Sequence, residues 1–77
     1  MSCVNERHHE DFLRIGLNIL YYRKQKGITQ QKLAEMTSYS KNHIQKIETA
    51  MASPSVEALL DIAEALEISP AKLFEIR

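Results

Sequence analysis

Residues 29–49, TQQKLAEMTSYSKNHIQKIET, predict two short helices separated by a very tight turn. Thr29 is a favourable N-cap, because its hydroxyl can accept a hydrogen bond from a backbone N–H of the first turn, and helix-forming residues follow it. Ser40 gives the same signal a second time. Ile44 and Ile47 then lie three residues apart, on one face of a second helix that should run from residue 41 to residue 48.

The turn between these predicted helices holds only Thr37, Ser38 and Tyr39. A connection this short joins helices that cross at a steep angle, which is the helix-turn-helix arrangement. We therefore predict that residues 29–49 form such a motif and that the rest of the chain holds it in place.

The outer face of the second predicted helix should carry only long donors and amides, without a carboxylate. Asparagine and glutamine can pair with adenine edges through two hydrogen bonds, and lysine can reach guanine acceptors or phosphate. An ordinary solvated helix surface explains the same residue types when this helix is considered alone. The residues expected on this face are Lys41, Asn42, Gln45, Lys46 and Thr49.

The longer run from Ile15 to Phe74, which is 60 of the 77 residues, resembles the phage repressor and Cro type of helix-turn-helix domain. The resemblance rests on an ordered set of short motifs. They are Arg-Lys before Lys-Gly-Ile-Thr-Gln, Leu-Ala in the first motif helix, Ser-Lys-x-x-Ile-x-x-Ile-Glu, Pro-Ser at the next helix start, and Ala-Leu-x-Ile-Ser-x-x-x-Leu-Phe at the end. It implies an all-α, compact five-helix domain similar to that of lambda repressor.

The resemblance also implies roles for individual residues. Contacts with base edges in the major groove are implied for Lys41, Asn42, Gln45 and Lys46. Contacts with DNA phosphates are implied for Gln30, Tyr39, His43 and Thr49. For Tyr39, packing into the core is the alternative. Arg23 and Glu48 match an architectural ion pair between the first and third helices.

The chain departs from the family at Ser38, Ala50 and Glu67, where glycine is common. At Ser38 the turn should adopt a left-handed backbone, whose steric cost polar residues tolerate best. Gly16 lies inside the first predicted helix, and the resemblance implies close helix packing there.

We expect residues 1–10 to form a flexible tail and residues 11–77 to form the domain, because the tail is polar and mixed in charge. Asp11 should cap the first helix, and Gly27 should end it. Near the other end, Ser55 and the Ser69-Pro70 pair are start signals for two further helices.

The last two predicted helices hold the apolar residues that could fill the core or form a dimer surface. Core spacing is seen for Val56, Leu59, Leu60, Ala63 and Leu66. The dimer surface is expected to include Ile62, Phe74 and Ile76. Core filling is the alternative for these three residues, and for Phe74 it is the preferred one.

The formal net charge is zero, but the charges are unevenly distributed. Residues 23–49 hold six basic and two acidic residues, whereas residues 50–77 hold two basic and five acidic residues. Because attraction to phosphate is screened within ~8 Å at physiological salt, a positive face can bind DNA while an acidic face points away.

Several classes of protein are disfavoured by the composition. The only cysteine, Cys3, permits no internal disulfide, which suits a reducing cytoplasm. No stretch approaches the ~18 apolar residues of a membrane span. The adjacent His8 and His9 would diverge on a helix, and no metal-ligand spacing, glycine-rich phosphate loop or nucleophile beside a histidine is evident, so we expect no metal, cofactor, small-molecule ligand or enzymatic activity.

The leading functional hypothesis is a sequence-specific regulator that binds double-stranded DNA as a homodimer on a palindromic operator. The alternative is a protein-interaction module of the same fold, such as an antitoxin or an adaptor. An interaction module would have no need to keep its outer helix face free of carboxylates.

Overall fold

Helices account for most of residues 6–76, the part of the chain that the computed structural model describes. The four α-helices in this part are α1 (His9–Lys26), α2 (Gln30–Thr37), α3 (Lys41–Glu48) and α4 (Val56–Leu66). Two 3₁₀ helices, η1 (Glu6–His8) and η2 (Pro70–Phe74), lie at its two ends. These residues contain no strand, which confirms the all-α prediction, but the expected fifth helix is a five-residue 3₁₀ helix.

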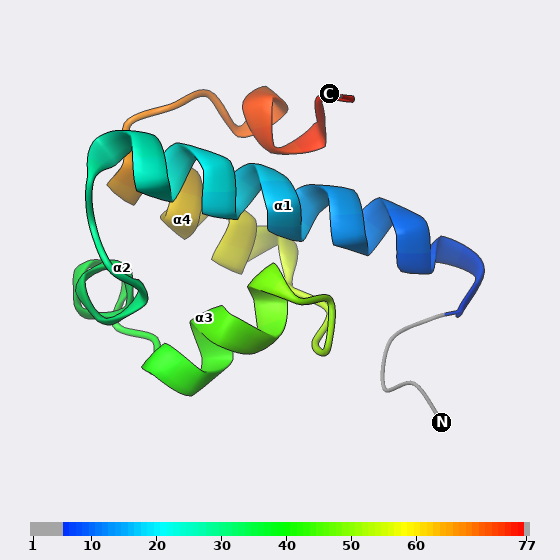
Figure 1. The fold of residues 1–77 in the computed structure, drawn as a ribbon, viewed down its shortest axis with the longest axis horizontal. Coiled ribbons are helices and arrows are strands. Elements are labelled where there is room, and N and C mark those ends of the chain that lie inside the picture. The colour runs from blue at the N-terminus through cyan, green and yellow to red at the C-terminus, as the bar shows by residue number, and fades with distance from the viewer. Residues whose placement is uncertain (1–5, 77) are drawn as a thin grey trace.

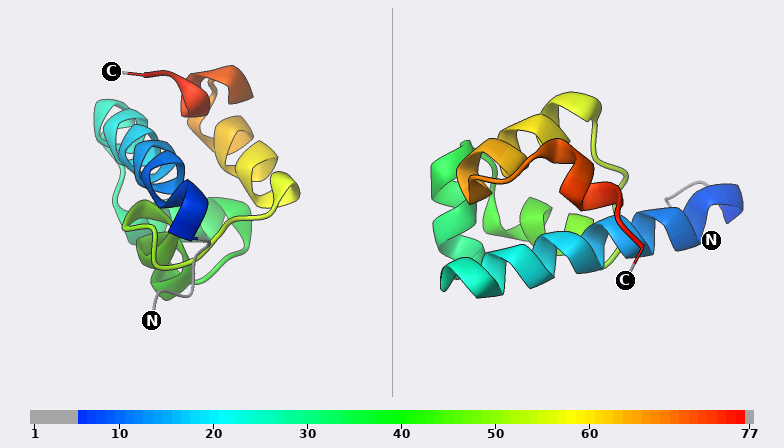
Figure 2. Two further views of the ribbon diagram at one scale, coloured as in Figure 1. Left: turned by 90° about the vertical axis from the view of Figure 1, so that its right-hand side faces the viewer. Right: turned by 90° about the horizontal axis from the view of Figure 1, so that it is seen from above.

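The long helix α1 is the element against which α3, α4 and η2 pack. The helix α2 contacts both α3 and α4. Figures 1 and 2 show α1 and α4 side by side, with η2 across one side of the pair and α3 on the opposite side. As a result α3 lies at the edge of the molecule that is farthest from the C-terminal segment.

The core receives side chains from every α-helix and from η2. Its buried members are Ile15, Ile19, Leu33, Ala34, Ile44, Ile47, Leu59, Ile62, Ala63, Leu66 and Leu73. Phe12, Tyr22, Ile28 and Tyr39 are partly buried against this cluster. Both motif helices therefore contribute to the same core as the rest of the chain.

The helix starts agree closely with the capping signals. The side-chain oxygens of Thr29, Ser40, Ser55 and Ser69 each accept a hydrogen bond from a backbone N–H two or three residues later, at 3.0–3.2 Å. Each bond satisfies a donor that the helix itself leaves free. The predicted starts of α2, α3, α4 and η2 are confirmed.

Among the described residues, four have a left-handed backbone: Gly27, Ser38, Ala50 and Glu67, with φ of 77°, 66°, 62° and 60°. Gly27 ends α1 as predicted. Ser38 ends α2, and Glu67 ends α4. The positions where this chain lacks the expected glycine are therefore positions at which the backbone favours one.

The start of α1 differs from the prediction. The helix begins at His9, and Asp11 does not cap it but accepts a hydrogen bond from Arg14 at 3.2 Å. Residues 6–10, expected to be part of a flexible tail, are helical. The rest of that predicted tail, residues 1–5, and Cys3 with it, lies outside the described residues.

The apolar residues of the last two helices also differ from the expectation. Ile62 is completely buried, so it cannot contribute to a dimer surface, and Phe74 is 57% exposed and does not fill the core. Leu73 and Phe74 point in different directions because consecutive residues of a 3₁₀ helix lie about 120° apart. On α4, Val56 and Leu60 are exposed.

Candidate nucleic-acid interface

The turn between α2 and α3 is held by backbone hydrogen bonds. The left-handed Ser38 directs its own N–H to the carbonyl oxygen of Ala34, and the N–H of Tyr39 donates to the same oxygen at 3.1 Å. Only Ser38, Tyr39 and Ser40 lie between the two helices. The predicted helix-turn-helix is confirmed, with its turn shifted by one residue.

The helix α3 is fixed to the core along one side. Ile44 and Ile47 are completely or almost completely buried, and the buried Glu48 follows them. Gly16 of α1 permits this close approach, because a Cβ atom at that position would overlap the backbone carbonyl oxygens of Ile47 and Glu48. The predicted close packing at Gly16 is therefore present.

An ion pair at the end of α3 joins three helices. Arg23 of α1 donates from Nε to Oε2 of Glu48 at 2.7 Å and from Nη2 to Oε1 at 3.2 Å, and both side chains are buried. Gln30 of α2 donates to Oε1 of the same carboxylate at 2.8 Å. The predicted Arg23–Glu48 pair is confirmed, and its two parallel hydrogen bonds fix the orientation of α3 more firmly than a single contact would.

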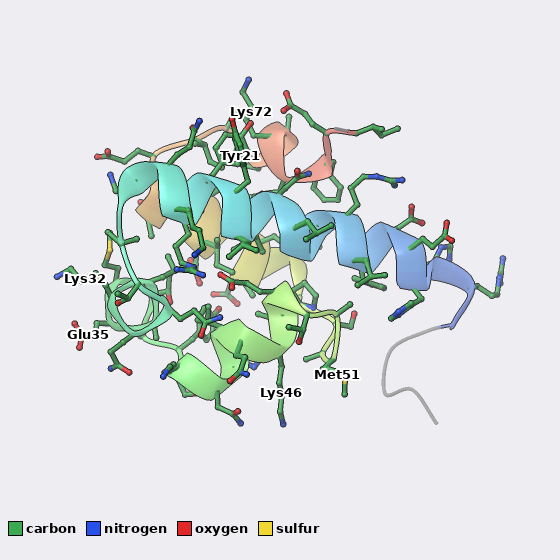
Figure 3. The ribbon with its side chains drawn as sticks, viewed as in Figure 1. Tyr21, Lys32, Glu35, Lys46, Met51 and Lys72 are labelled. Atoms are coloured by element: carbon green, nitrogen blue, oxygen red, sulfur yellow. The ribbon has the colours of Figure 1, made fainter. Side chains whose placement is uncertain are left out.

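The opposite side of α3 projects into solvent. Within the described residues, Lys41 and Lys46 form no ion pair, and the side chain of Lys46 extends away from the body of the molecule (Figure 3). One helical turn separates Lys41 from Gln45, and another separates Asn42 from Lys46, so the four exposed residues form two neighbouring stripes. This face presents hydrogen-bond donors and amides to any ligand that approaches α3.

The four residues expected at phosphates lie in different environments. Gln30 is half-buried at the first position of α2, where its amide already donates one hydrogen to Glu48. His43 is half-buried beside the ring of Tyr39, with the ring centroids 5.3 Å apart. Thr49 is exposed, and its hydroxyl donates to the carbonyl oxygen of Gln45 at 2.9 Å.

Tyr39 is partly buried against the core, and its hydroxyl bonds within the protein. Its hydroxyl donates to Oδ2 of Asp61 on α4 at 3.0 Å. This hydrogen bond to a carboxylate raises the pKa of the Tyr39 phenol above its ordinary value, so at neutral pH the phenol stays a donor to Asp61. The alternative expected for Tyr39, packing against the core, is therefore the one seen in the structure.

Ion pairs within the protein reduce the number of basic residues that could meet a ligand. Two of the basic residues in the 23–49 segment are neutralised within the protein: Arg23 pairs with Glu48, and Lys26 pairs with Glu67 at 2.7 Å. The exposed basic residues that remain on the motif helices are Lys32, Lys41 and Lys46. The acidic residues Glu57, Asp61 and Glu64 all belong to α4.

Asn18 is a structural residue that was not predicted from the sequence. It is buried in α1, and its Nδ2 donates to the carbonyl oxygens of Leu73 and Glu75, both at 2.9 Å. It therefore ties the C-terminal segment to α1. The signal available in the sequence was its position between Ile15 and Ile19 on the apolar face of the helix.

Neither a metal centre nor a membrane span is found in residues 6–76. No group of three or more side chains of the metal-ligating types comes together within the residues that the structure describes. In the same part of the chain, no helix combines the length and the apolar character needed to cross a membrane.

Comparison with known proteins agrees with this geometry. A helix-turn-helix family model matches residues 19–73. An uncharacterised HTH-type transcriptional regulator of Sinorhizobium fredii, y4dJ, is 29% identical over 59 residues, which are 77% of each chain. Two longer HTH-type regulators also match, and the chain spans 41% and 21% of their lengths, so those matches are confined to one part of each protein.

Solved structures with the same fold include a controller protein and a repressor. The restriction-modification controller protein C.AhdI of Aeromonas hydrophila superposes with a TM-score of 0.84 and 28% identity, covering 87% of this chain and 97% of that one. The P22 c2 repressor, solved in complex with a synthetic operator, has a TM-score of 0.73 and 33% identity, covering 79% and 92%. The chain belongs to the helix-turn-helix family of DNA-binding transcriptional regulators, of the phage repressor and Cro type.

Proposed function

We propose that this regulator recognises a specific palindromic operator in double-stranded DNA and binds it as a homodimer in the cytoplasm. The observation that carries the proposal is the outer face of α3. Lys41, Asn42, Gln45 and Lys46 are all exposed there, without a carboxylate among them, on a helix whose inner face is held by the core and by the buried Arg23–Glu48 pair.

These four residues would read base edges when α3 enters the major groove. The N-terminus of α2 would then lie at the sugar-phosphate backbone. Gln30 supports this placement, because its amide nitrogen carries two hydrogens and only one is needed by Glu48. The second hydrogen and the positive end of the α2 dipole would both favour a phosphate there.

A single copy would read too little DNA to find one site in a genome. The eight residues of α3 make a helix about 12 Å long, which reaches only a few base pairs. Two copies related by a two-fold axis would read two half-sites spaced roughly 34 Å apart. Phe74 and Ile76, which are 57% and 81% exposed, support a second protein surface near the C-terminus.

The test is selection of bound sites from a random pool of duplex DNA, with affinity followed as salt is raised. We expect enrichment of a palindrome whose half-sites lie about one helical turn apart, and affinity that falls with salt as phosphate contacts release counterions. Absence of enrichment, with weak binding only at low salt, would contradict the proposal and favour the protein-interaction module.

A further inference from the structure

Met51 is an exposed apolar side chain directly beside the face that we assign to DNA. It follows α3 in the connection to α4 and is 57% exposed. Figure 3 shows Met51 and Lys46 projecting from the same edge of the molecule, whereas Tyr21 and Lys72 project from the opposite edge. The thioether therefore lies on the same side of the molecule as the exposed face of α3, which we assign to base contacts.

Backbone hydrogen bonds fix the position of Met51 relative to α3. The N–H groups of Met51 and Ala52 both donate to the carbonyl oxygen of Lys46, at 2.7 and 3.2 Å, and the N–H of Ala50 donates to Ile47 at 3.2 Å. With the left-handed φ of 62° at Ala50, these bonds form a Schellman motif. Ala50 is also buried, so the main chain that carries Met51 is held both by these hydrogen bonds and by packing.

The four residues that we assign to base edges cannot supply an apolar contact. Lys41, Asn42, Gln45 and Lys46 supply polar groups only, whereas the major groove also displays the 5-methyl group of thymine, which is read by apolar contact. An unbranched, polarisable methionine side chain adapts well to such a contact.

Single exposed hydrophobic residues are common, so exposure alone does not distinguish Met51. Met36, a second exposed methionine, can be compared with Met51. It is 42% exposed, but it lines a shallow groove with Asp61 and Glu64, whose carboxylates would repel a phosphate backbone. Met51 differs in being held on the basic side, next to Lys46.

We propose that Met51 is a further specificity-determining residue, which contacts the 5-methyl group of a thymine in each half-site. This inference rests on the proposed function. It adds a residue outside the helix-turn-helix motif to the set that reads the operator.

The experiment removes the thymine methyl group from the DNA and the Met51 side chain from the protein, each without the other. In the selected operator each thymine is replaced in turn by deoxyuridine, which lacks only the 5-methyl group. At one position per half-site, wild-type protein should bind the deoxyuridine duplex about fourfold more weakly, as expected for one apolar carbon withdrawn from contact. The Met51→Ala variant should bind the two duplexes equally.

Two control variants make the result specific to an apolar contact at this position. Met51→Leu should retain the preference for thymine, and Met36→Ala should behave as wild type. Circular dichroism should show that all three variants remain folded, since both methionines are exposed.

The inference would be overturned if no thymine position depended on Met51, or if Met51→Ala weakened both duplexes equally, which would indicate a sugar or phosphate contact. An operator that is selected but read without Met51 would contradict only this inference. Failure to select any operator would contradict the proposed function, and this inference with it.

Discussion

Among single residues, the buried Glu48 fixes how the exposed face of α3 is presented, although its carboxylate does not lie on that face. It receives Arg23 from α1 and Gln30 from α2, so one carboxylate sets the relation of α3 to both other helices. A buried charge is tolerated only when it is paired and hydrogen-bonded. Removing one partner should therefore cost more than removing both.

We expect Arg23→Met to lower the free energy of unfolding by about 3–5 kcal/mol, because it leaves Glu48 buried without its counter-charge. The double variant Arg23→Met with Glu48→Leu should recover most of this loss. Urea unfolding followed by circular dichroism measures both. Asp11→Ala, which removes exposed contacts with Arg14 and His8, should change stability by less than about 0.5 kcal/mol and is the control. Equal losses in the single and double variants would contradict this explanation.

Substitutions of the exposed residues of α3 should change DNA recognition and leave the stability of the fold unchanged. Replacing Lys41, Asn42 and Gln45 together by alanine should reduce discrimination between operator and random DNA by about 1–3 kcal/mol for each good base contact that the substitutions remove. Gln30→Ala should instead weaken binding to all sequences about equally. Competition binding with both DNAs gives the two quantities. An unchanged sequence preference in the triple variant would refute the assignment of these residues to bases.

Among the secondary-structure elements, the ends of helices were predicted well and their buried faces less well. Capping depends on a few neighbouring residues, so Thr29 and Ser40 could be identified from the sequence. Which face of α4 is buried depends on the helices packed against it. Ile62 is therefore buried while Leu60, with equally suitable chemistry, is exposed.

The candidate nucleic-acid interface was also predictable only in part. The separation of exposed donors from buried isoleucines on α3 follows from helical periodicity. The hydrogen bond from Tyr39 to Asp61 does not follow from periodicity, because it depends on how α4 lies beside the turn.

The left-handed positions at helix ends allow a reciprocal pair of substitutions. Ser38→Gly should raise the free energy of unfolding by about 0.5–1 kcal/mol, because glycine adopts φ of 66° without a steric cost. Gly27→Ala should lower it by about 1 kcal/mol for the same reason, and its new methyl group would meet nothing within 4 Å. Urea unfolding tests both. A stability loss in Ser38→Gly would show that the serine side chain outweighs the backbone strain.

The contact between the ends of α1 and α4 should be sensitive to acid. The hydrogen bond from Lys26 lowers the pKa of Glu67 below its ordinary value of 4.5. The stability from this contact is therefore fully present above pH 4.5 and is lost as the pH falls through the lower, folded pKa. NMR titration of the Glu67 carboxyl should show its pKa rising towards 4.5 in Lys26→Met. An unchanged pKa would mean that Lys26 is not its cause.

For the molecule as a unit, a zero net charge is compatible with DNA binding because the charges are unevenly divided among the helices, although the exposed Glu35 belongs to α2. Lys32, Lys41 and Lys46 belong to the motif helices, whereas the acidic residues of α4 belong to another element. Since attraction to phosphate is local, the basic side can bind while total charge contributes little steering. With few lysines on the interface, one copy should bind weakly, and affinity should depend on joining two copies.

The proposed homodimer leads to a prediction about the complete assembly. Phe74→Ser with Ile76→Ser should convert dimer to monomer and weaken binding to the palindrome by on the order of 100-fold, because each half-site is then bound separately. Sedimentation equilibrium and operator titration measure the two effects. Leu17→Ser, on the equally exposed outer side of α1, is the matched control and should leave both unchanged. If Leu17→Ser dissociated the dimer and the C-terminal variant did not, the two-fold axis would lie beside α1. The C-terminal placement of the dimer surface would then be wrong, while the assignment of α3 to the major groove would stand.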